Sequence, residues 1–313
     1  MSLGILEPSE FLQSKLSYDF MKRIIETLSS NSKLMNLYSE HIDTIHSFHT
    51  FHDEIIKTFN YSNFHNTERS YFNQGIYSDI DDLEDTIRMI MNKLSCISTR
   101  ISSIIDASNS CKMDSNDKYG YFLYCTKHRS KVLEKRFKNI QGHIINIRDN
   151  DGNVLYELDS GSFTYKKKDN SNVFIECDEI NNLTNQLNSS IDKLKKMNKM
   201  YWDTSMNNLY STYNKFLQRL HLFIADVDVS STIAKVSIQN KYCKPIFIDN
   251  EKSCLVAKDI RHPIVERISI DTEYITNDVI LGKDEKDGIL LFGTNACGKS
   301  TLMKAIGLNV IMA

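Results

Sequence analysis

The sequence predicts a mainly α-helical protein with some β structure, in which long helices carry a β-rich tip and an α/β domain with a phosphate-binding loop follows. Three observations predict this arrangement. No proline interrupts residues 9–244, so nothing there breaks a helix outright. Glycine is absent from residues 5–74 and 162–281, whereas four glycines gather between residues 120 and 161. Residues 293–300 match a phosphate-binding loop at every fixed position.

Composition excludes several classes of protein. The 313 residues suffice for two or three domains, and 41% hydrophobic and 25% charged residues are typical of a globular chain rather than a disordered one. No apolar run approaches the roughly 20 residues of a membrane span, and the N-terminus lacks the pattern of a secretory signal. We therefore expect an intracellular protein of the cytoplasm, nucleus or a viral factory. The seven cysteines show no C-x-x-C pair and indicate reduced, structural thiols.

Two glycine-free stretches show helical periodicity. In the second, apolar residues recur at steps of three and four from Ile180 to Leu220, which predicts a helix of about 40 residues and roughly 60 Å, suited to a lever. In the first, helical spacing extends from Leu34 to Phe59 and again from Ile80 to Ile90. The glycine-rich island between them would form the tip.

The island, residues 119–180, contains short runs typical of β-strands at 120–127, 143–149, 153–159 and 172–178, with DNDGN as a hairpin turn signal. It is also basic. A solvated lysine-rich surface is one interpretation, and contact with nucleic-acid phosphates is the one we favour for a charged hairpin tip. The candidate DNA-binding residues are Lys127, Arg129, Lys131, Lys135, Arg136, Lys138, Lys166, Lys167 and Lys168.

After Asp226 the runs 244–249, 253–260 and 288–293 have the length and apolarity of strands. The last run leads into GTNACGKS, with a helix-like segment after it. In such a loop, glycines let successive N–H groups face an anion, the lysine bridges the outer phosphates, and the serine hydroxyl ligates Mg²⁺. The candidate nucleotide-binding residues are Gly293, Thr294, Asn295, Ala296, Cys297, Gly298, Lys299, Ser300 and Thr301, with Ser300 as the metal ligand. Cys297 fits either a redox-sensing thiolate or, as we favour, a small residue tolerated in the loop.

These segments, in order, resemble the MutS family of DNA mismatch-repair ATPases. The resemblance is carried by ADVDV (225–229), YCKP (242–245), RHPIVE (261–266), YITNDV (274–279) and GTNACGKST (293–301), and upstream by FNQGIYSDIDDL (72–83) and YGYFLYCTK (119–127). It implies core and lever helices in 1–118, a DNA clamp in 119–180, a returning lever in 181–224, and the N-terminal part of an ABC-type ATPase domain in 225–313. Arg261 and His262 fall in one of these motifs, where we expect structural roles.

The same resemblance implies ATP or ADP with Mg²⁺ as cofactors, mismatched double-stranded DNA as a partner, a homodimer and a MutL-like partner. Tyr274 falls where the family places an aromatic that stacks on adenine, although a strand aromatic packed in a core is the alternative. Thr294, Ala296 and Cys297 replace the family's usual Pro, Met and Gly, which indicates a divergent branch that could come from a large DNA virus.

The sequence stops one helix after the loop, before the acidic Walker B strand. We therefore expect a fragment that does not hydrolyse ATP efficiently alone, and we assign no catalytic residue. The alternatives are a non-hydrolysing product that binds DNA and nucleotide, or a recombination-controlling member of the family, which the island at 119–180 argues against. A condensin-like or RecN-like ATPase would place the loop before its coiled arms. His46, His49 and His52 have helical spacing, but we interpret them as surface or packing residues rather than metal ligands.

Overall fold

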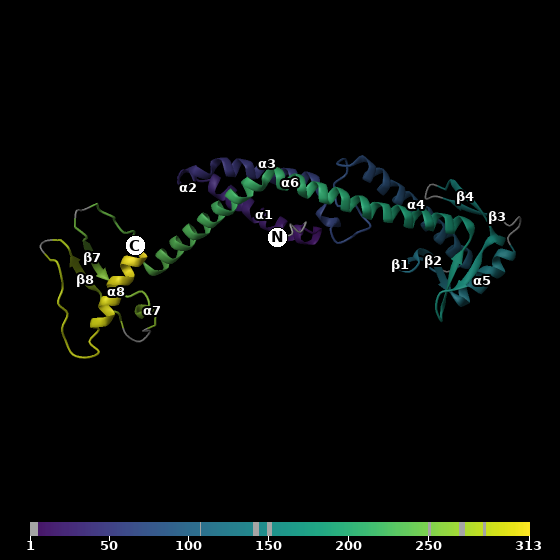
Figure 1. Cartoon of the computed structure of the whole chain (residues 1–313). Helices are drawn as coiled ribbons and strands as arrows, with labels where there is room; N and C mark the ends of the chain where they lie inside the picture. Colours follow the sequence, from purple (N-terminus) through teal and green to yellow (C-terminus); the bar gives the residue numbers. More distant parts are fainter. Residues whose placement is uncertain are drawn as a thin grey trace. The chain divides into compact units, whose positions relative to one another are not determined.

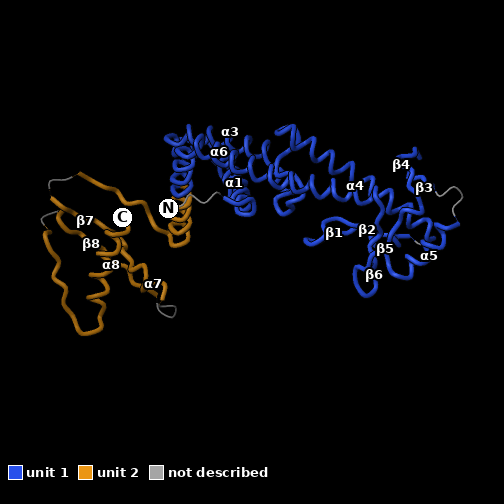
Figure 2. Tube along the Cα trace, turned by 45° about the vertical axis from the view of Figure 1, so that its right-hand side comes forward, with its two compact units in different colours: residues 1–226 blue, residues 227–313 orange. Residues whose placement is uncertain are grey.

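The computed structural model describes residues 6–106, 108–139, 144–148, 152–249, 252–268, 273–283 and 286–313. The chain divides into two compact units, Met1–Asp226 and Val227–Ala313 (Figure 2). Both combine helices with small antiparallel sheets, in agreement with the mixed α and β class that the sequence predicts. In the described part of the chain, every helix is too short or too polar to cross a bilayer.

Unit 1 is built on long helices that run beside one another (Figure 1). Its longest helix contacts two others: the Tyr213 hydroxyl donates to Glu54, and the Tyr201 hydroxyl donates to Asp79 at 2.6 Å. Pro8 begins the first helix, where its missing N–H costs nothing. The α and 3₁₀ helices of the N-terminal half are α1 Pro8–Ser29, α2 Ser32–Leu37, η1 Ser39–His41, α3 Ile42–Thr58, η2 Tyr61–Asn63 and α4 Ser78–Ile105.

The periodicity between Leu34 and Phe59 does not form one helix. The short helix α2 ends at Leu37, and the 3₁₀ turn η1 separates it from α3. Leu37 is 74% exposed, whereas Ile45 and Ile55 on α3 are buried. Apolar spacing alone therefore overstated this helix, because Leu37 finds no packing surface among the described residues that would stabilise a continuous helix.

An aromatic cluster joins the N-terminal helices to the returning helix. The Trp202 ring lies 5.3–5.6 Å from the rings of Phe11, Phe59 and Phe64, mostly edge to face. The Trp202 indole N–H donates to the Leu6 carbonyl at 2.7 Å, so burial of this ring leaves no polar atom unpaired. Segments that lie almost 200 residues apart in sequence thus share one core.

The returning helix α6, Asp178–Asn240, has 63 residues and is longer than the roughly 40 predicted. The amphipathic stripe fades after Leu220, but residues 221–240 contain neither proline nor glycine, so nothing ends the helix there. It ends where Lys241 takes a left-handed conformation (φ 54°) and Tyr242 N–H bonds to the Ser237 carbonyl, a Schellman motif. Its last residues fall in unit 2.

The island at 119–180, together with β1 just before it, forms two small antiparallel sheets and a helix. Strands occupy all four predicted runs, in a four-stranded sheet of order β1-β2-β6-β5 and a β3-β4 hairpin. The predicted turn residues 149–151 lie outside the described residues. The sequence did not predict β1, β5 or helix α5. The elements are β1 Lys112–Asn116, β2 Gly120–Thr126, α5 Lys127–Lys138, β3 Ile144–Arg148, β4 Val154–Asp159, η4 Ser160–Ser162, β5 Thr164–Lys167 and β6 Asn172–Glu176.

Unit 2 contains β7 Leu255–Ile260, the short helix α7 Val265–Ile268, β8 Asn277–Leu281 and α8 Lys299–Met312. The strand predicted at 253–260 is confirmed as β7, which pairs with β8. The strands predicted at 244–249 and 288–293 are wrong: both segments lack strand structure. A strand requires a ladder partner, and β7 and β8 pair with each other. Phe247 and Phe292 are accordingly 79% and 88% exposed.

Candidate phosphate-binding site

Residues 293–298 form a tight turn that leads directly into helix α8. Gly293, Ala296 and Gly298 have φ angles of 151°, 64° and 92°, values that side chains other than glycine rarely adopt. The two glycines of the sequence motif therefore stand at backbone positions that require them. A Cβ on Gly293 would also lie 2.9 Å from the Cys297 sulfur, so the exposed Cys297 side chain would have to move to admit it.

The first turn of α8 has backbone donors available to an anion. Gly298 is the N-cap and supplies no side-chain acceptor, and no acidic residue stands in the first turn. The unpaired N–H groups and the helix dipole both favour negative charge at this position. This combination of a glycine-bounded turn and an uncapped 14-residue helix can bind phosphate oxygens.

Lys299 lies over this turn rather than in solvent. Its ammonium group donates to the carbonyl oxygens of Gly293 at 2.8 Å and Thr294 at 2.6 Å. The same nitrogen is 3.6 Å from the Cys297 sulfur. The cation is thus positioned at the mouth of the turn, where the oxygens of a phosphate chain could replace these carbonyls as acceptors.

The remaining predicted residues surround the turn in different ways. Thr294, Asn295, Ala296 and Cys297 are exposed, Ser300 is exposed on the first turn of α8, and Thr301 is half-buried. Tyr274 is half-buried in the segment before β8, and among the described residues no hydrogen bond or ring contact joins it to the turn. The structure therefore brings together residues 293–301, and leaves Tyr274 outside that contact network.

Arg261 and His262 support the unit that carries this turn. Arg261 forms a part-buried ion pair with Glu266 at 2.6 Å and donates to the carbonyls of Asn240 and Lys241 at the end of α6. Asn309 of α8 donates to the Arg261 carbonyl at 2.8 Å. Arg261 directly follows the last residue of β7 and therefore links that strand to the end of α6 and to α8.

His262 is 5% exposed and acts at the start of α7. Its Nδ1 accepts hydrogen bonds from the backbone N–H groups of Ile264 at 3.3 Å and Val265 at 3.2 Å. The imidazole thereby satisfies donors that the helix leaves unpaired. Both residues of the pair make structural contacts.

The predicted DNA-binding residues fall on α5 and on the β5–β6 hairpin, where Lys166 and Lys167 lie at the end of β5 and Lys168 lies in the turn that follows. Six lie on α5, an amphipathic helix whose buried side is Ser130, Leu133 and Phe137. Lys131, Lys135 and Lys138 repeat at steps of four and three on the exposed side. We call these three lysines the basic face of α5. Exposed His128 has the same periodicity and was missed, although the spacing of apolar residues in 127–138 would have indicated it.

Other members of the predicted set already have partners. Arg136 pairs with Asp106 at 2.5 Å, Lys166 pairs with Glu176, and the Lys127 ammonium donates to the Asn170 carbonyl at 2.7 Å. Lys168 lies over the Tyr124 ring at 3.7 Å, and its side chain is only 18% exposed. Exposed Lys167 lies on β5, and half-buried Arg129 lies on α5. Lys138 on the basic face of α5 is also 3.7 Å from Glu134, but this pair is exposed and therefore weak. The basic face is consequently the part of this set best suited to a polyanion.

His46, His49 and His52 do not converge on one point. His46 and His49 are exposed, whereas His52 is 6% exposed and lies 3.5 Å from Asp19 and 3.7 Å from Asp53. This agrees with the surface and packing roles expected from the sequence.

Comparison with known proteins gives relatives along the entire chain. No family model matches it. The chain is 27% identical to the mutS homolog L359 of Acanthamoeba polyphaga mimivirus, covering 100% of this chain and 32% of the relative. It is 26% identical to the DNA mismatch repair protein MutS of Petrotoga mobilis, covering 100% and 34%. It is 24% identical to the mitochondrial mutS homolog of Sarcophyton glaucum, covering 98% and 29%.

The chain thus spans about a third of the length of these curated relatives. The similarity includes the helices of unit 1, the strands of the island and the turn of unit 2, because it extends over essentially all 313 residues. Along its whole length, the chain is thus similar to proteins of the MutS family.

Proposed function

We propose that the turn at 293–301 binds the phosphates of ATP or ADP together with Mg²⁺, as part of a DNA mismatch-repair protein. One observation carries the proposal: Lys299 is placed over a glycine-bounded turn at the uncapped N-terminus of α8. A cation, a helix dipole and free backbone donors at one point favour a multiply charged anion.

The residues present fit a nucleotide with its metal. Backbone N–H groups of the turn and of the first turn of α8 would hold phosphate oxygens, and the Lys299 ammonium would bridge them. The Ser300 hydroxyl, exposed at the second residue of α8, would ligate Mg²⁺. Bound Mg²⁺ would supply charge neutralisation at the phosphates. Half-buried Tyr274, in the segment before β8, would stack on the base.

Nucleotide binding tests this proposal. Lys299→Ala should weaken binding of a fluorescent ATP analogue by more than tenfold, since it removes the only side-chain cation that lies over the turn in the described residues. The matched control is Lys304→Ala, an exposed lysine one turn later on α8, which should leave binding within about twofold. Equal affinity of the Lys299→Ala and unchanged chains would contradict the site.

We further propose that the basic face of α5 contacts the phosphate backbone of double-stranded DNA. The relatives are named for DNA mismatch repair. Three exposed lysines on one face of a helix can neutralise phosphates without reading sequence. From the similarity to MutS proteins we also propose that the protein prefers mismatched DNA and forms a homodimer. A MutL-like protein would be a further partner.

Salt dependence separates this contact from a merely solvated surface. The affinity for DNA falls as salt rises, and each phosphate contact contributes about −0.9 to the slope of log affinity against log salt concentration. Replacing Lys131, Lys135 and Lys138 with Ala should therefore make this slope less steep by about 2 to 3. A control with the same charge change replaces Lys33, Lys57 and Lys215, exposed lysines on α2, α3 and α6. If both triple variants change the slope equally, the basic face has no special role.

A further inference from the structure

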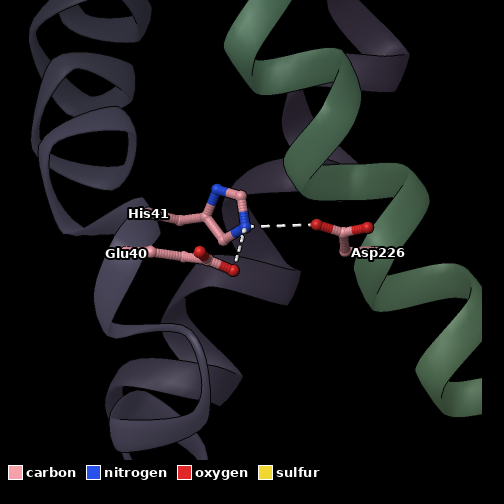
Figure 3. Close-up of side chains that lie close together, drawn as sticks. All are labelled: Glu40, His41 and Asp226. Carbon is pink, nitrogen blue, oxygen red and sulfur yellow. Dashed lines mark hydrogen bonds and ion pairs between the residues drawn. The ribbon is translucent and has the colours of Figure 1, made fainter.

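A second cluster of ligating side chains lies in unit 1, far in sequence from the phosphate-binding turn. Glu40 and His41 belong to η1, and Asp226 lies on α6 (Figure 3). The His41 Nε2 atom is 3.2 Å from Asp226 Oδ2 and 3.6 Å from Glu40 Oε1. One ligand atom from each residue lies within 4.8 Å of the other two, and within the described ranges this is the one group of three such side chains.

The spacing of these atoms fits a small divalent ion. Zn²⁺ binds imidazole nitrogen and carboxylate oxygen at about 2.0–2.2 Å in a tetrahedron. The edges of a tetrahedron with such bonds are about 3.3–3.6 Å long. The two separations from Nε2, 3.2 Å and 3.6 Å, are close to these edges. The two carboxylate oxygens lie within 4.8 Å of each other, and their exposed side chains can adjust to the third edge.

The imidazole is fixed by packing and not by the carboxylates alone. The His41 ring lies 5.2 Å from the Phe223 ring, and Phe223 is completely buried. Tyr38 packs edge to face on Phe223 at 5.9 Å. The His41 side chain is 15% exposed, whereas the carboxylate side chains of Glu40 and Asp226 are 80% and 60% exposed. The packed His41 imidazole can therefore keep its position while the exposed carboxylates of Glu40 and Asp226 move to coordinate an ion, so the core does not have to rearrange.

Helix α6 contacts His41 through two side chains. Phe223 and Asp226 are three residues apart and therefore lie on the same face of the helix. The first packs against the imidazole and the second faces its Nε2 atom. The histidine thus contacts α6 through both its ring face and its outer nitrogen.

We propose that Glu40, His41 and Asp226 form a binding site for a divalent transition-metal ion of the Zn²⁺ class, with water completing the coordination. Two carboxylates balance the charge of the ion, and an imidazole ligand favours Zn²⁺ over Mg²⁺ and Ca²⁺, which prefer oxygen ligands alone. The bound ion would join η1 to α6 at the last residue of unit 1. This site is independent of the proposed nucleotide site.

Isothermal titration of the full chain with Zn²⁺ tests the proposal. The expected result is a site that His41→Ala or Asp226→Asn weakens at least tenfold, since each variant removes one of three protein ligands. The matched controls are His46→Ala, an exposed histidine on α3, and Asp228→Asn, an exposed carboxylate two residues further on α6. Both controls should bind Zn²⁺ with unchanged affinity.

Two further measurements keep the proposal falsifiable. Circular dichroism would show whether His41→Ala folds. If that variant is unfolded, the Zn²⁺ affinity of Asp226→Asn, which preserves the shape of the side chain, tests the site instead. Co²⁺ in place of Zn²⁺ gives absorption bands that report thiolate ligands, so binding at the cysteines would be recognised. Zn²⁺ affinity that both site variants leave unchanged, or a thiolate spectrum lost on alkylation, would overturn the site.

Discussion

The side-chain amide of Asn188 on α6 lies directly against the backbone of Gly120 at the start of β2. The Asn188 Oδ1 atom accepts a hydrogen bond from the Tyr121 N–H at 2.9 Å. A Cβ added to Gly120, whose φ is 63°, would lie 2.3 Å from the Asn188 amide nitrogen. The long helix and the sheet therefore meet at a position where a side chain in place of Gly120 would displace the Asn188 amide.

We predict that Gly120→Ala destabilises unit 1 by about 2 kcal/mol, from the left-handed φ and from displacement of the Asn188 hydrogen bond. Gly75→Ala is the control, because Gly75 has φ 89° but open space around it, and should cost about 1 kcal/mol. Urea unfolding followed by the fluorescence of buried Trp202, the single tryptophan, measures both. In an Asn188→Ala background the two glycine variants should cost the same, and a persistent difference would contradict the contact.

A buried amide on α6 predicts a second stability effect. Asn198, 2% exposed, donates to the Arg69 carbonyl at 2.8 Å and accepts from the Tyr71 N–H at 3.3 Å. Asn198→Ala leaves both backbone groups without these partners and should cost about 2 kcal/mol. Exposed Asn207→Ala on the same helix controls for helix propensity and should be neutral or slightly stabilising. Equal unfolding midpoints for the two variants would show that the bridge contributes nothing.

Cysteine reactivity provides a test of the phosphate-binding turn without mutation. Burial raises the pKa of Cys111 to about 12 and that of Cys125 to about 11, so both thiols should react slowly at neutral pH. Cys243 and Cys297 are exposed and should be alkylated first. Mg²⁺–ATP at ten times its dissociation constant should slow alkylation of Cys297 about tenfold, as followed by peptide mass spectrometry.

Cys243, outside the turn, is the internal control for that experiment and should react at an unchanged rate. Protection of neither thiol by nucleotide would argue against binding at the turn, and equal protection of both would indicate a change in the whole unit.

The hydrogen bond between Tyr121 and Glu68 should stabilise the fold less at alkaline pH than at neutral pH. Burial, and then the 2.6 Å hydrogen bond to Glu68, raises the pKa of Tyr121 to about 12 from the usual 10.0. The unfolded chain therefore loses this proton first, and the contribution of Tyr121, complete below pH 10, is lost as the pH rises toward 12.

The measurement is the difference in unfolding free energy between the unchanged chain and Tyr121→Phe, from pH 9 to pH 11. This difference should shrink as the pH rises, and Glu68→Gln should make the decline smaller because the acceptor is no longer charged. A difference that stays constant with pH would show that Tyr121 titrates alike in both states.

Much of the candidate site could be predicted from local sequence. Gly293, Gly298 and Lys299 are recognisable because a phosphate-binding turn needs left-handed backbone and a cation at fixed short spacing, and the structure gives them that geometry. The four strand runs of the island were equally readable, since alternation and β-branched residues act within a few positions. Local chemistry is enough where every interacting group lies within one turn or one strand.

Other features depended on partners that are distant in sequence. The segments 244–249 and 288–293 have strand composition but no strand structure, because ladder hydrogen bonds require a neighbour that composition cannot supply. The convergence of His41 with Asp226, 185 residues apart, and the fit of Asn188 against Gly120 arise only when α6 packs on the earlier elements. The sequence by itself determined the phosphate-binding turn and the helical and β-rich regions; tertiary packing decided which apolar runs are paired and which polar groups meet.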